Sequence, residues 1–236
     1  MSQLAHPHAD RTNLGDGISL TDRLLTVRFT HPQRVLSWAI VNGGARRSQA
    51  IVWRHVLDEE LGVFVDPAAL LRQSLESIGL PDAVGLLTSR ALHTFEQSSR
   101  SSGELSARCL TTVGLGNALA AGDAPGPLTS AGTINTLCQI SAPLSEAALV
   151  EAVALVTEAR TAALLEAQIP SRRSAHWASG TGTDCVVVAC AEASTERATE
   201  RYVGKHTTVG ALIGAAVREA TARGIQRWIA ERGGRG

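Results

Sequence analysis

A glycine-rich polar loop runs directly into a β-branched apolar segment, and this junction constrains the possible folds more than any other feature. The loop covers residues 179–184, with the sequence Ser-Gly-Thr-Gly-Thr-Asp, and the valine-rich segment that follows covers residues 185–190. A short apolar run bounded by turn residues is typical of a buried strand. Such a strand holds Thr183 and Asp184 on a rigid edge, where functional groups are usually presented. The alternative interpretation is a tight turn whose two glycines supply positive φ angles.

Other short apolar segments have the pattern of β-strands. His31 and Pro32 break the first part of the chain into two of them, and Asn42-Gly43 is a strong hairpin signal, although residues 48–57 do not mirror the preceding strand. Residues 92–96 fit either a strand or a short helix. The predicted strands are residues 23–29, 35–41, 84–89, 108–113, 137–140 and 185–190.

Three segments have helical periodicity. Residues 66–78 begin with Asp66 at the N-cap and Pro67 at the first helical position, residues 144–168 form the longest helix, and residues 211–222 form the last. Strands dominate early and helices late, which predicts a single α/β domain with a mixed β-sheet covered by helices, or alternatively an αββα sandwich. We expect a flexible N-terminal lead-in over residues 1–20 and the folded domain over residues 21–232.

Composition excludes several function classes. The 22 basic and 22 acidic residues cancel and aromatic residues make up 3% of the chain, so we expect no nucleic-acid partner. The N-terminus lacks the apolar core of a signal peptide, and no apolar run approaches the roughly 18–20 residues of a membrane span, so we expect a cytoplasmic protein without a membrane partner. A homo-oligomer stays open. The cysteines lack C-x-x-C spacing and are expected to be free, buried and reduced; they are Cys109, Cys138, Cys185 and Cys190.

The glycines of residues 114–116 resemble a dinucleotide fingerprint only superficially. The third glycine is misplaced and no βαβ unit with a downstream acidic residue follows, so we expect no nucleotide site. The chain also has no H-E-x-x-H or H-x-H signature in its body, and we expect no metal site.

Several short motifs occur in an order that is more specific than any one of them. They are Val-Asn-Gly-Gly at 41–44, Gly-Leu-Gly-Asn-Ala and Ala-Gly-Asp within 114–123, Gly-Thr-Ile-Asn-Thr at 132–136, a helix with Ala-Leu-Val-Glu-Ala-Val and Thr-Glu-Ala-Arg-Thr-Ala-Ala-Leu within 148–164, Ser-Gly-Thr-Gly-Thr-Asp at 179–184, and Tyr-Val-Gly-Lys-His-Thr-Thr-Val-Gly-Ala-Leu-Ile-Gly at 202–214. In this series the chain resembles the adenosylcobinamide amidohydrolases, the CbiZ family of cobamide salvage, over most of its length.

The resemblance implies hydrolysis of the amide that joins the cobyric acid carboxyl to aminopropanol in adenosylcobinamide. The products are adenosylcobyric acid and 1-amino-2-propanol. The domain over residues 21–232 is then an adenosylcobinamide amidohydrolase domain. The corrinoid is its small-molecule substrate, and no cofactor is implied.

Amide hydrolysis needs an activated nucleophile, a proton for the leaving amine and donors for the oxyanion. Asp184 is the leading candidate for the general base, with Glu158 and Asp123 as alternatives; Glu158 can instead pair with a nearby arginine on a solvated face. The nucleophile is Thr183, Thr133 or a water molecule. Amides, hydroxyls and glycine-lined loops suit an amide-rich corrinoid; the predicted substrate-binding residues are Asn42, Gly43, Gly44, Asn117, Thr133, Asn135, Thr181, Gly182, His206 and Thr207.

Two other functions stay open. Gly-Thr-Ile-Asn-Thr before a strand suggests a self-processing hydrolase with a threonine nucleophile, which would give two fragments on a denaturing gel. A corrinoid-binding module without catalysis would retain cobinamide unchanged.

Overall fold

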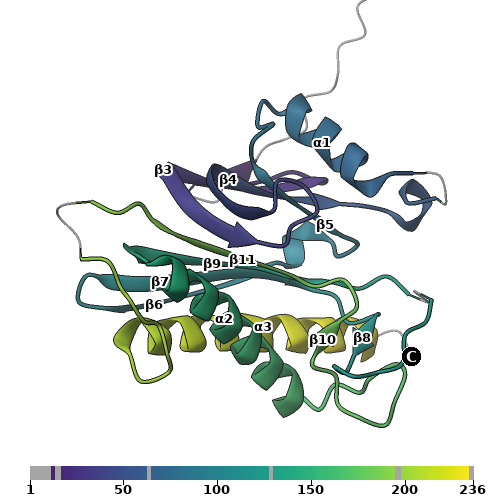
Figure 1. The fold of residues 1–236 in the computed structure, drawn as a ribbon. Helices are drawn as coiled ribbons and strands as arrows, with labels where there is room; N and C mark the ends of the chain where they lie inside the picture. Colours follow the sequence, from purple (N-terminus) through teal and green to yellow (C-terminus); the bar gives the residue numbers. More distant parts are fainter. Residues whose placement is uncertain (1–11, 14–16, 63–64, 128–129, 195–197, 234–236) are drawn as a thin grey trace, which may run out of the picture.

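The computed structural model describes residues 12–13, 17–62, 65–127, 130–194 and 198–233 (Figure 1). Within these ranges nine strands form one sheet in the order β1-β2-β3-β11-β9-β7-β6, with β4 paired to β3 and β5 paired to β4. The strands of this sheet are β1 (Thr12–Asn13), β2 (Ile18–Leu20), β3 (Leu24–Ser37), β4 (Gly44–His55), β5 (Val84–Thr88), β6 (Glu96–Ser102), β7 (Leu105–Val113), β9 (Ile134–Pro143) and β11 (Cys185–Ala191). The helices are α1 (Pro67–Ser77), α2 (Glu146–Glu166) and α3 (Thr208–Gly233).

The sheet is mixed. β11 pairs in parallel with β9, and β4 pairs in parallel with β5, whereas the other neighbouring strands are antiparallel. A second, two-stranded sheet joins β8 (Ala118–Leu119) to β10 (Gly180–Thr181). The predicted single α/β domain with a mixed sheet covered by helices is confirmed.

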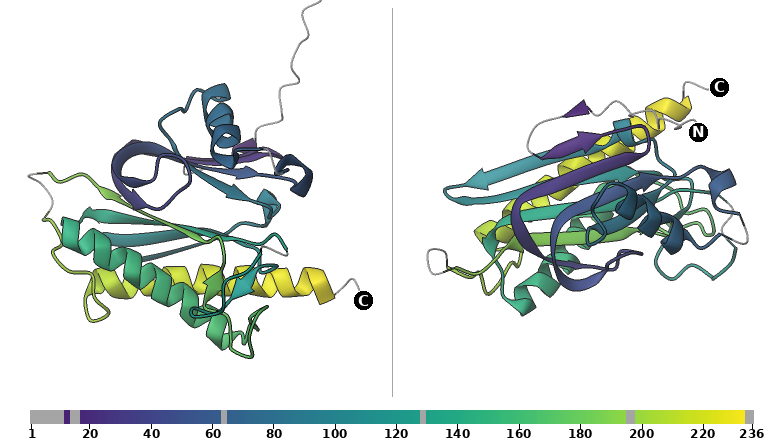
Figure 2. Two further views of the ribbon diagram at one scale, coloured as in Figure 1. Left: turned by 45° about the vertical axis from the view of Figure 1, so that its right-hand side comes forward. Right: turned by 90° about the horizontal axis from the view of Figure 1, so that it is seen from above.

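The sheet is stacked on itself. Figure 1 shows β3, β4 and β5 lying over β11, β9, β7 and β6, with α1 outside the first group and α2 and α3 outside the second. The left view in Figure 2 shows the same order of layers. The layers therefore run helix, sheet, sheet, helix. The αββα arrangement that the sequence left as an alternative describes how this one continuous sheet is layered.

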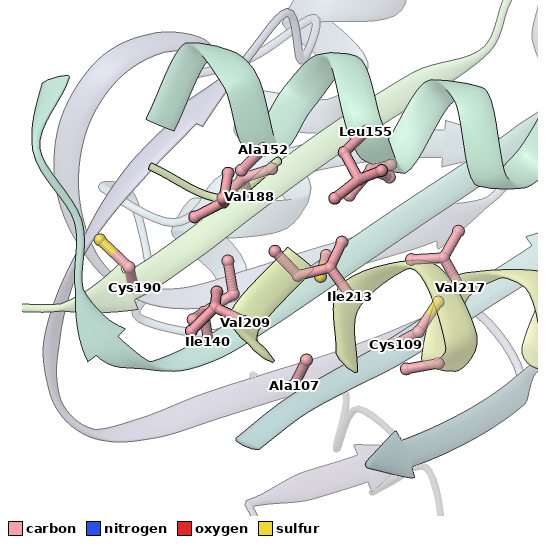
Figure 3. Packing of buried hydrophobic residues seen from close by; sticks show 14 of the residues in the cluster. Ala107, Cys109, Ile140, Ala152, Leu155, Val188, Cys190, Val209, Ile213 and Val217 are labelled. Carbon is pink, nitrogen blue, oxygen red and sulfur yellow. The ribbon is translucent and has the colours of Figure 1, made fainter. Parts of the chain in front are cut away.

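Four hydrophobic clusters of the described residues fill the core; one of them includes Val113 of β7, Leu164 of α2 and Ile225 of α3, and the other three lie between the layers. The largest lies between the sheet and the two long helices, where Val188 of β11 and Ile140 of β9 pack with Leu155 of α2 and Ile213 of α3 (Figure 3). A second cluster, which includes the fully buried Trp53, lies between the two halves of the sheet. The third packs α1 against β4 and β5. The four cysteines are free and buried, as predicted.

The predicted break at His31-Pro32 is wrong, because one strand, β3, runs through both residues. Its pairing with β4 shifts register between Arg28 and Gln33, and Pro32 falls inside this interruption. Proline has no N–H to donate, so a strand tolerates it where no ladder bond is required. A hairpin does form around Asn42, although residues 48–57 weakened that interpretation of the sequence: β3 and β4 are antiparallel neighbours, and Asn42 adopts the left-handed conformation with φ of 57°.

The predicted lead-in is shorter than 20 residues. β2 pairs with β3, and Ile18 is only 2% exposed, so residues 18–20 belong to the folded sheet. Residues 1–11 and 14–16 of the predicted lead-in lie outside the described residues.

α1 and α2 begin where the sequence predicts, whereas α3 begins at Thr208, before the predicted start at residue 211. The Asp66 carboxylate accepts the Ala68 N–H at 2.9 Å at the start of α1, and the Ser145 hydroxyl accepts the Ala148 N–H at 3.1 Å at the start of α2. α3 is longer than residues 211–222, because the apolar positions that follow continue the same helix. In the described ranges, no helix combines the length and the apolar character needed to cross a membrane.

Candidate active site

A cleft of about 500 Å³ opens where β9 and β11 begin and β5 ends. Polar residues from the loops before β9 and β11 line it together with mostly apolar residues from β5 and from the segment after β3. Its lining comprises Trp38, Ile40, Val56, Leu61, Pro67, Leu86, Leu87, Thr88, Ser89, Ala131, Gly132, Thr133, Asn135, Gly182, Thr183, Asp184 and Cys185. Five of the predicted site residues therefore share one cleft: Thr133, Asn135, Gly182, Thr183 and Asp184.

The two candidate nucleophiles are hydrogen-bonded to each other. The hydroxyl oxygens of Thr133 and Thr183 lie 2.6 Å apart, and the Thr183 hydroxyl also donates to the Gly132 carbonyl oxygen at 3.1 Å. Since Thr183 has one hydroxyl proton, donation to Gly132 leaves Thr133 as the donor between the two threonines. The arrangement is a short chain of hydroxyls that ends on a peptide carbonyl beside the cleft.

The Asp184 carboxylate is occupied by structural contacts. Oδ1 accepts the Ile134 N–H at 2.9 Å and the Thr181 hydroxyl, and Oδ2 accepts the Thr181 N–H at 2.8 Å. Arg160 Nη1 lies 3.0 Å from Oδ2 in ion-pair contact, although it is not aligned for a hydrogen bond. The side chains of Asp184 and Arg160 are 8% and 6% exposed. These contacts favour a positioning role for Asp184, which ties the loop before β11 to the start of β9; the general-base role stays a prediction.

Glycines allow the loops before β8, β9 and β11 to pack closely against one another. A Cβ on Gly180 would lie 2.4 Å from Asp184 Oδ2, and a Cβ on Gly182 would lie 2.6 Å from Asn117 Nδ2. A Cβ on Gly132 would lie 2.6 Å from the backbone nitrogen of Gly116. Gly132 therefore packs backbone against backbone on the loop before β8, whereas Gly180 and Gly182 leave room for the side chains of Asp184 and Asn117.

The glycines at 114 and 116 take part in this packing. They lead into the two-residue strand β8, which pairs with β10, and not into a helix whose N-terminus could bind phosphate. Asn117 lies in the same region, and its backbone carbonyl accepts the Gly182 N–H at 3.2 Å.

Trp38 and Arg160 belong to the site but were not singled out from the sequence. The Trp38 indole N–H donates to the Asp184 carbonyl oxygen at 2.7 Å, while 50% of the residue stays exposed beside the cleft. No sequence signal marks Trp38, because a tryptophan in an apolar segment is more often part of the core. Arg160 had a signal: it lies four residues after Val156 and three before Ala163 on the buried face of α2, and a charge there requires a buried partner.

The other catalytic candidates lie away from the cleft lining. Glu158 is 54% exposed on α2 and forms an ion pair with Lys205. Asp123 accepts hydrogen bonds from the Ser171 hydroxyl and from the Ala120 N–H; the first of these is the main reason that the pKa of Asp123 is held below its ordinary value. Their catalytic roles stay predictions.

The remaining predicted substrate-binding residues also have structural contacts. The Asn42 side chain donates to the Pro81 and Ala83 carbonyls, both at 2.8 Å, and holds the β3–β4 turn against the segment before β5. The Thr207 hydroxyl accepts the Gly210 N–H and caps α3. Thr181 binds Asp184, as described above. Gly43, Gly44 and His206 do not line the cleft.

Cys185 lines the cleft but is a poor nucleophile. Burial raises the pKa of its thiol to about 12, so the thiol stays protonated at neutral pH. Among the described residues, no group of three or more His, Cys, Asp or Glu side chains is placed to hold a metal ion. The prediction that no metal is needed stays a prediction.

A wider groove of about 1130 Å³ lies at the opposite ends of β9 and β11, where Gln139 and Glu192 contribute to its lining. None of the predicted site residues lines this groove. The smaller cleft is therefore the candidate active site.

Comparisons with known proteins found one relative by sequence and two solved structures that are similar to this chain. An uncharacterized protein of Methanocaldococcus jannaschii, MJ1613, is 35% identical over 95 residues, which are 40% of this chain. The match covers 36% of the length of that relative. Two solved structures align over most of the chain at 12% identity. The PH0078 protein of Pyrococcus horikoshii has a TM-score of 0.45 over 92% of this chain and 83% of its own, and the L-aminopeptidase D-Ala-esterase/amidase of Ochrobactrum anthropi has a TM-score of 0.41 over 91% and 80%.

The sequence profile of one family covers nearly the whole chain. It is described as adenosylcobinamide amidohydrolase, CbiZ, and matches residues 9–233. The chain therefore belongs to the adenosylcobinamide amidohydrolase family, a family of amide hydrolases.

Proposed function

We propose that the protein hydrolyses the amide bond between the cobyric acid carboxyl and aminopropanol in adenosylcobinamide, releasing adenosylcobyric acid and 1-amino-2-propanol. The observation that carries this proposal is the pair of hydroxyls, Thr133 and Thr183, 2.6 Å apart in the cleft of a chain from this family. Hydroxyl groups become nucleophiles toward amides when a neighbouring group takes their proton.

Thr133 is the nucleophile in this proposal. It donates its proton toward Thr183, which leaves a lone pair of its own oxygen free for attack. The Thr133 carbonyl accepts the Gly114 N–H at 3.0 Å, and the next residue, Ile134, is bound to Asp184. These bonds fix the backbone on which the nucleophile is carried, and a fixed nucleophile lowers the entropic cost of attack.

The cleft suits one arm of a corrinoid better than the whole molecule. At about 500 Å³ it accommodates the aminopropanol amide, and the bulky ring stays outside. The exposed faces of Trp38 and Ile40, at 50% and 47%, then offer an apolar surface to the ring. Thr88, Ser89 and Asn135 also line the cleft; the Asn135 side chain donates to the Leu87 carbonyl at 2.7 Å, and the Thr88 hydroxyl accepts the Arg90 N–H at 3.0 Å.

The first test is to incubate the purified protein with adenosylcobinamide, with and without a chelator, and to look for adenosylcobyric acid by mass spectrometry. We expect product in both samples. Product that is lost only with the chelator would direct the search for ligands to His55, His176 and His206. Corrinoid that is retained but unchanged would favour a binding module without catalysis.

The second test assigns the nucleophile. Thr133→Ala is expected to lower kcat by roughly a thousandfold or more, because the attacking oxygen is gone, whereas Thr133→Ser keeps an oxygen at that position. Thr157→Ala is the matched control, because the Thr157 hydroxyl donates to the Val153 carbonyl within α2. Wild-type turnover in Thr133→Ala would remove Thr133 from this role.

A further inference from the structure

The cleft contains a nucleophile but no free base to activate it. Among the described residues that line the cleft, Asp184 is the only carboxylate, and no histidine or lysine lines it. Both oxygens of Asp184 already accept hydrogen bonds from the backbone. A threonine needs a general base to attack an amide in water, so the base has to come from another group at this position.

The peptide bond between Gly132 and Thr133 lies at the end of the hydroxyl chain. Thr183 bonds to the Thr133 hydroxyl at 2.6 Å and donates to the Gly132 carbonyl at 3.1 Å, so it bridges a nucleophile and the carbonyl directly before it. A hydroxyl on residue i reaches the carbonyl carbon of residue i−1 through a five-membered ring. Thr183 is placed to pass a proton from the first oxygen to the second.

We propose that the protein cleaves its own chain between Gly132 and Thr133, and that the α-amino group released on Thr133 is the general base for hydrolysis of the substrate amide. The second part rests on the proposed function, and the first does not.

The cleavage balances with water as the only co-reactant. The Thr133 hydroxyl oxygen bonds to the Gly132 carbonyl carbon, its proton passes to Thr183, and the Thr183 proton passes to the carbonyl oxygen. The neutral tetrahedral intermediate then breaks its C–N bond as the proton returns through Thr183 to the nitrogen, which gives an ester between Gly132 and the Thr133 oxygen and a free amine on Thr133. Water hydrolyses the ester to the Gly132 carboxylate and restores the Thr133 hydroxyl.

The surroundings hold both sides of this peptide bond. Gly132 packs so closely against Gly116 that a Cβ would lie 2.6 Å from the Gly116 nitrogen. The Gly114 N–H donates to the Thr133 carbonyl at 3.0 Å, and Asp184 accepts the Ile134 N–H at 2.9 Å. Since the last two bonds do not involve the cleaved peptide, Thr133 stays in position after cleavage.

The released amine supplies the missing base. An α-amino group titrates at about pH 7.7–8.0, so a substantial part of it is neutral near physiological pH. It sits on the same residue as the attacking hydroxyl, within reach of its proton. With the Thr133 amine as the base, Asp184 is left to position the start of β9, which is the role that its contacts support.

The decisive measurement is the mass of the purified full-length protein under denaturing conditions, after prolonged incubation at neutral pH. We expect two fragments, residues 1–132 and 133–236, whose masses add up to the intact chain plus one water. Thr133→Ala should stay a single chain of 24.7 kDa, and Thr133→Ser should still cleave. Thr183→Val should cleave at least about tenfold more slowly than Thr183→Ser, because only the serine keeps the bridging hydroxyl. Circular dichroism shows whether each variant is folded.

The outcomes separate the two proposals. A wild-type protein that stays a single chain overturns the self-cleavage, whether or not it hydrolyses adenosylcobinamide. Fragments that end elsewhere, or that also form from Thr133→Ala, indicate an outside protease and likewise overturn it. Fragments that end at Gly132 without any turnover of adenosylcobinamide support self-cleavage and remove the proposed substrate.

Discussion

The hydroxyl oxygens of Thr133 and Thr183 lie 2.6 Å apart although fifty positions separate them in the sequence. Thr133 directly precedes β9, and Thr183 lies two residues before β11. These strands are parallel neighbours, with Asn135 opposite Cys185. Parallel neighbours begin at the same edge of a sheet, so residues just before each strand meet there. The hydroxyl pair is therefore a direct consequence of the parallel pairing.

Asp184→Asn is expected to destabilise the fold. Asp184 and Arg160 are both nearly buried, and removing the charge of one leaves the other without compensation. Breaking such a buried pair costs roughly 3–5 kcal/mol. Urea unfolding measures the change in the free energy of unfolding.

The matched control is Glu166→Gln. Glu166 pairs with Arg218, and their side chains are 54% and 56% exposed, so solvent screening limits the loss to about 1 kcal/mol or less. If Asp184→Asn were as stable as wild type but inactive, Asp184 would be the general base and not a positioning residue.

Trp38→Ala is expected to raise KM for adenosylcobinamide about tenfold, which corresponds to about 1.4 kcal/mol. The variant removes the exposed apolar face beside the cleft, where the ring of the substrate is proposed to lie. Trp38→Phe keeps an aromatic face but loses the indole N–H that donates to the Asp184 carbonyl. Steady-state kinetics of both variants separate the two contributions. A fall in kcat at constant KM in Trp38→Phe would mean that Trp38 acts by holding Asp184.

Thiol alkylation is expected to leave activity unchanged. Burial raises the pKa of Cys138 and Cys185 to about 12, and it also raises the pKa of Cys109 and Cys190 above the ordinary value. The reactive thiolate is therefore scarce at pH 8. Iodoacetamide should label all four cysteines only after denaturation. Mass spectrometry gives the number of labelled cysteines before and after denaturation. Rapid inactivation of the folded protein through Cys185 would contradict this prediction.

Acid is expected to weaken the contact between α3 and the end of β5. Arg90 donates to both oxygens of Glu231, at 2.5 and 2.8 Å, and this bond is the main reason that the pKa of Glu231 lies below its ordinary value. A carboxyl group whose pKa is lowered by folding stabilises the protein at any pH above its pKa in the unfolded chain, about 4.3. This stabilisation is lost as the pH falls through the pKa of the group in the folded protein. Because Glu231 is 35% exposed, the contribution is about 1 kcal/mol or less.

Urea unfolding at pH 7 and at pH 3 tests this contribution. Glu231→Gln should be less stable than wild type at pH 7, and the difference should shrink toward pH 3 as the Glu231 carboxylate is protonated. A difference that persists at pH 3 would mean that the side chain stabilises by packing and not by its charge.

Local sequence signals predicted the elements whose ends are determined locally. Asp66 and Ser145 cap α1 and α2 as expected, because a cap depends on residues only two or three positions away. Pro32 misled the prediction of β3, because its effect depends on whether the neighbouring strand needs a ladder bond at that point. The partner of Glu158 was likewise beyond local patterns: the sequence suggested a nearby arginine, but Glu158 pairs with Lys205 from a distant loop.

The sequence by itself determined the family, the α/β class and the loops that carry Thr133, Thr183 and Asp184, since each of these depends on the order and spacing of residues along the chain. Only the tertiary structure decided which of these side chains meet and which contacts each one makes. The parallel pairing of β9 with β11 brings the hydroxyls of Thr133 and Thr183 together. The buried guanidinium of Arg160 forms an ion pair with the Asp184 carboxylate. Contacts between residues far apart in the chain depend on strand order and helix packing, which local patterns do not encode.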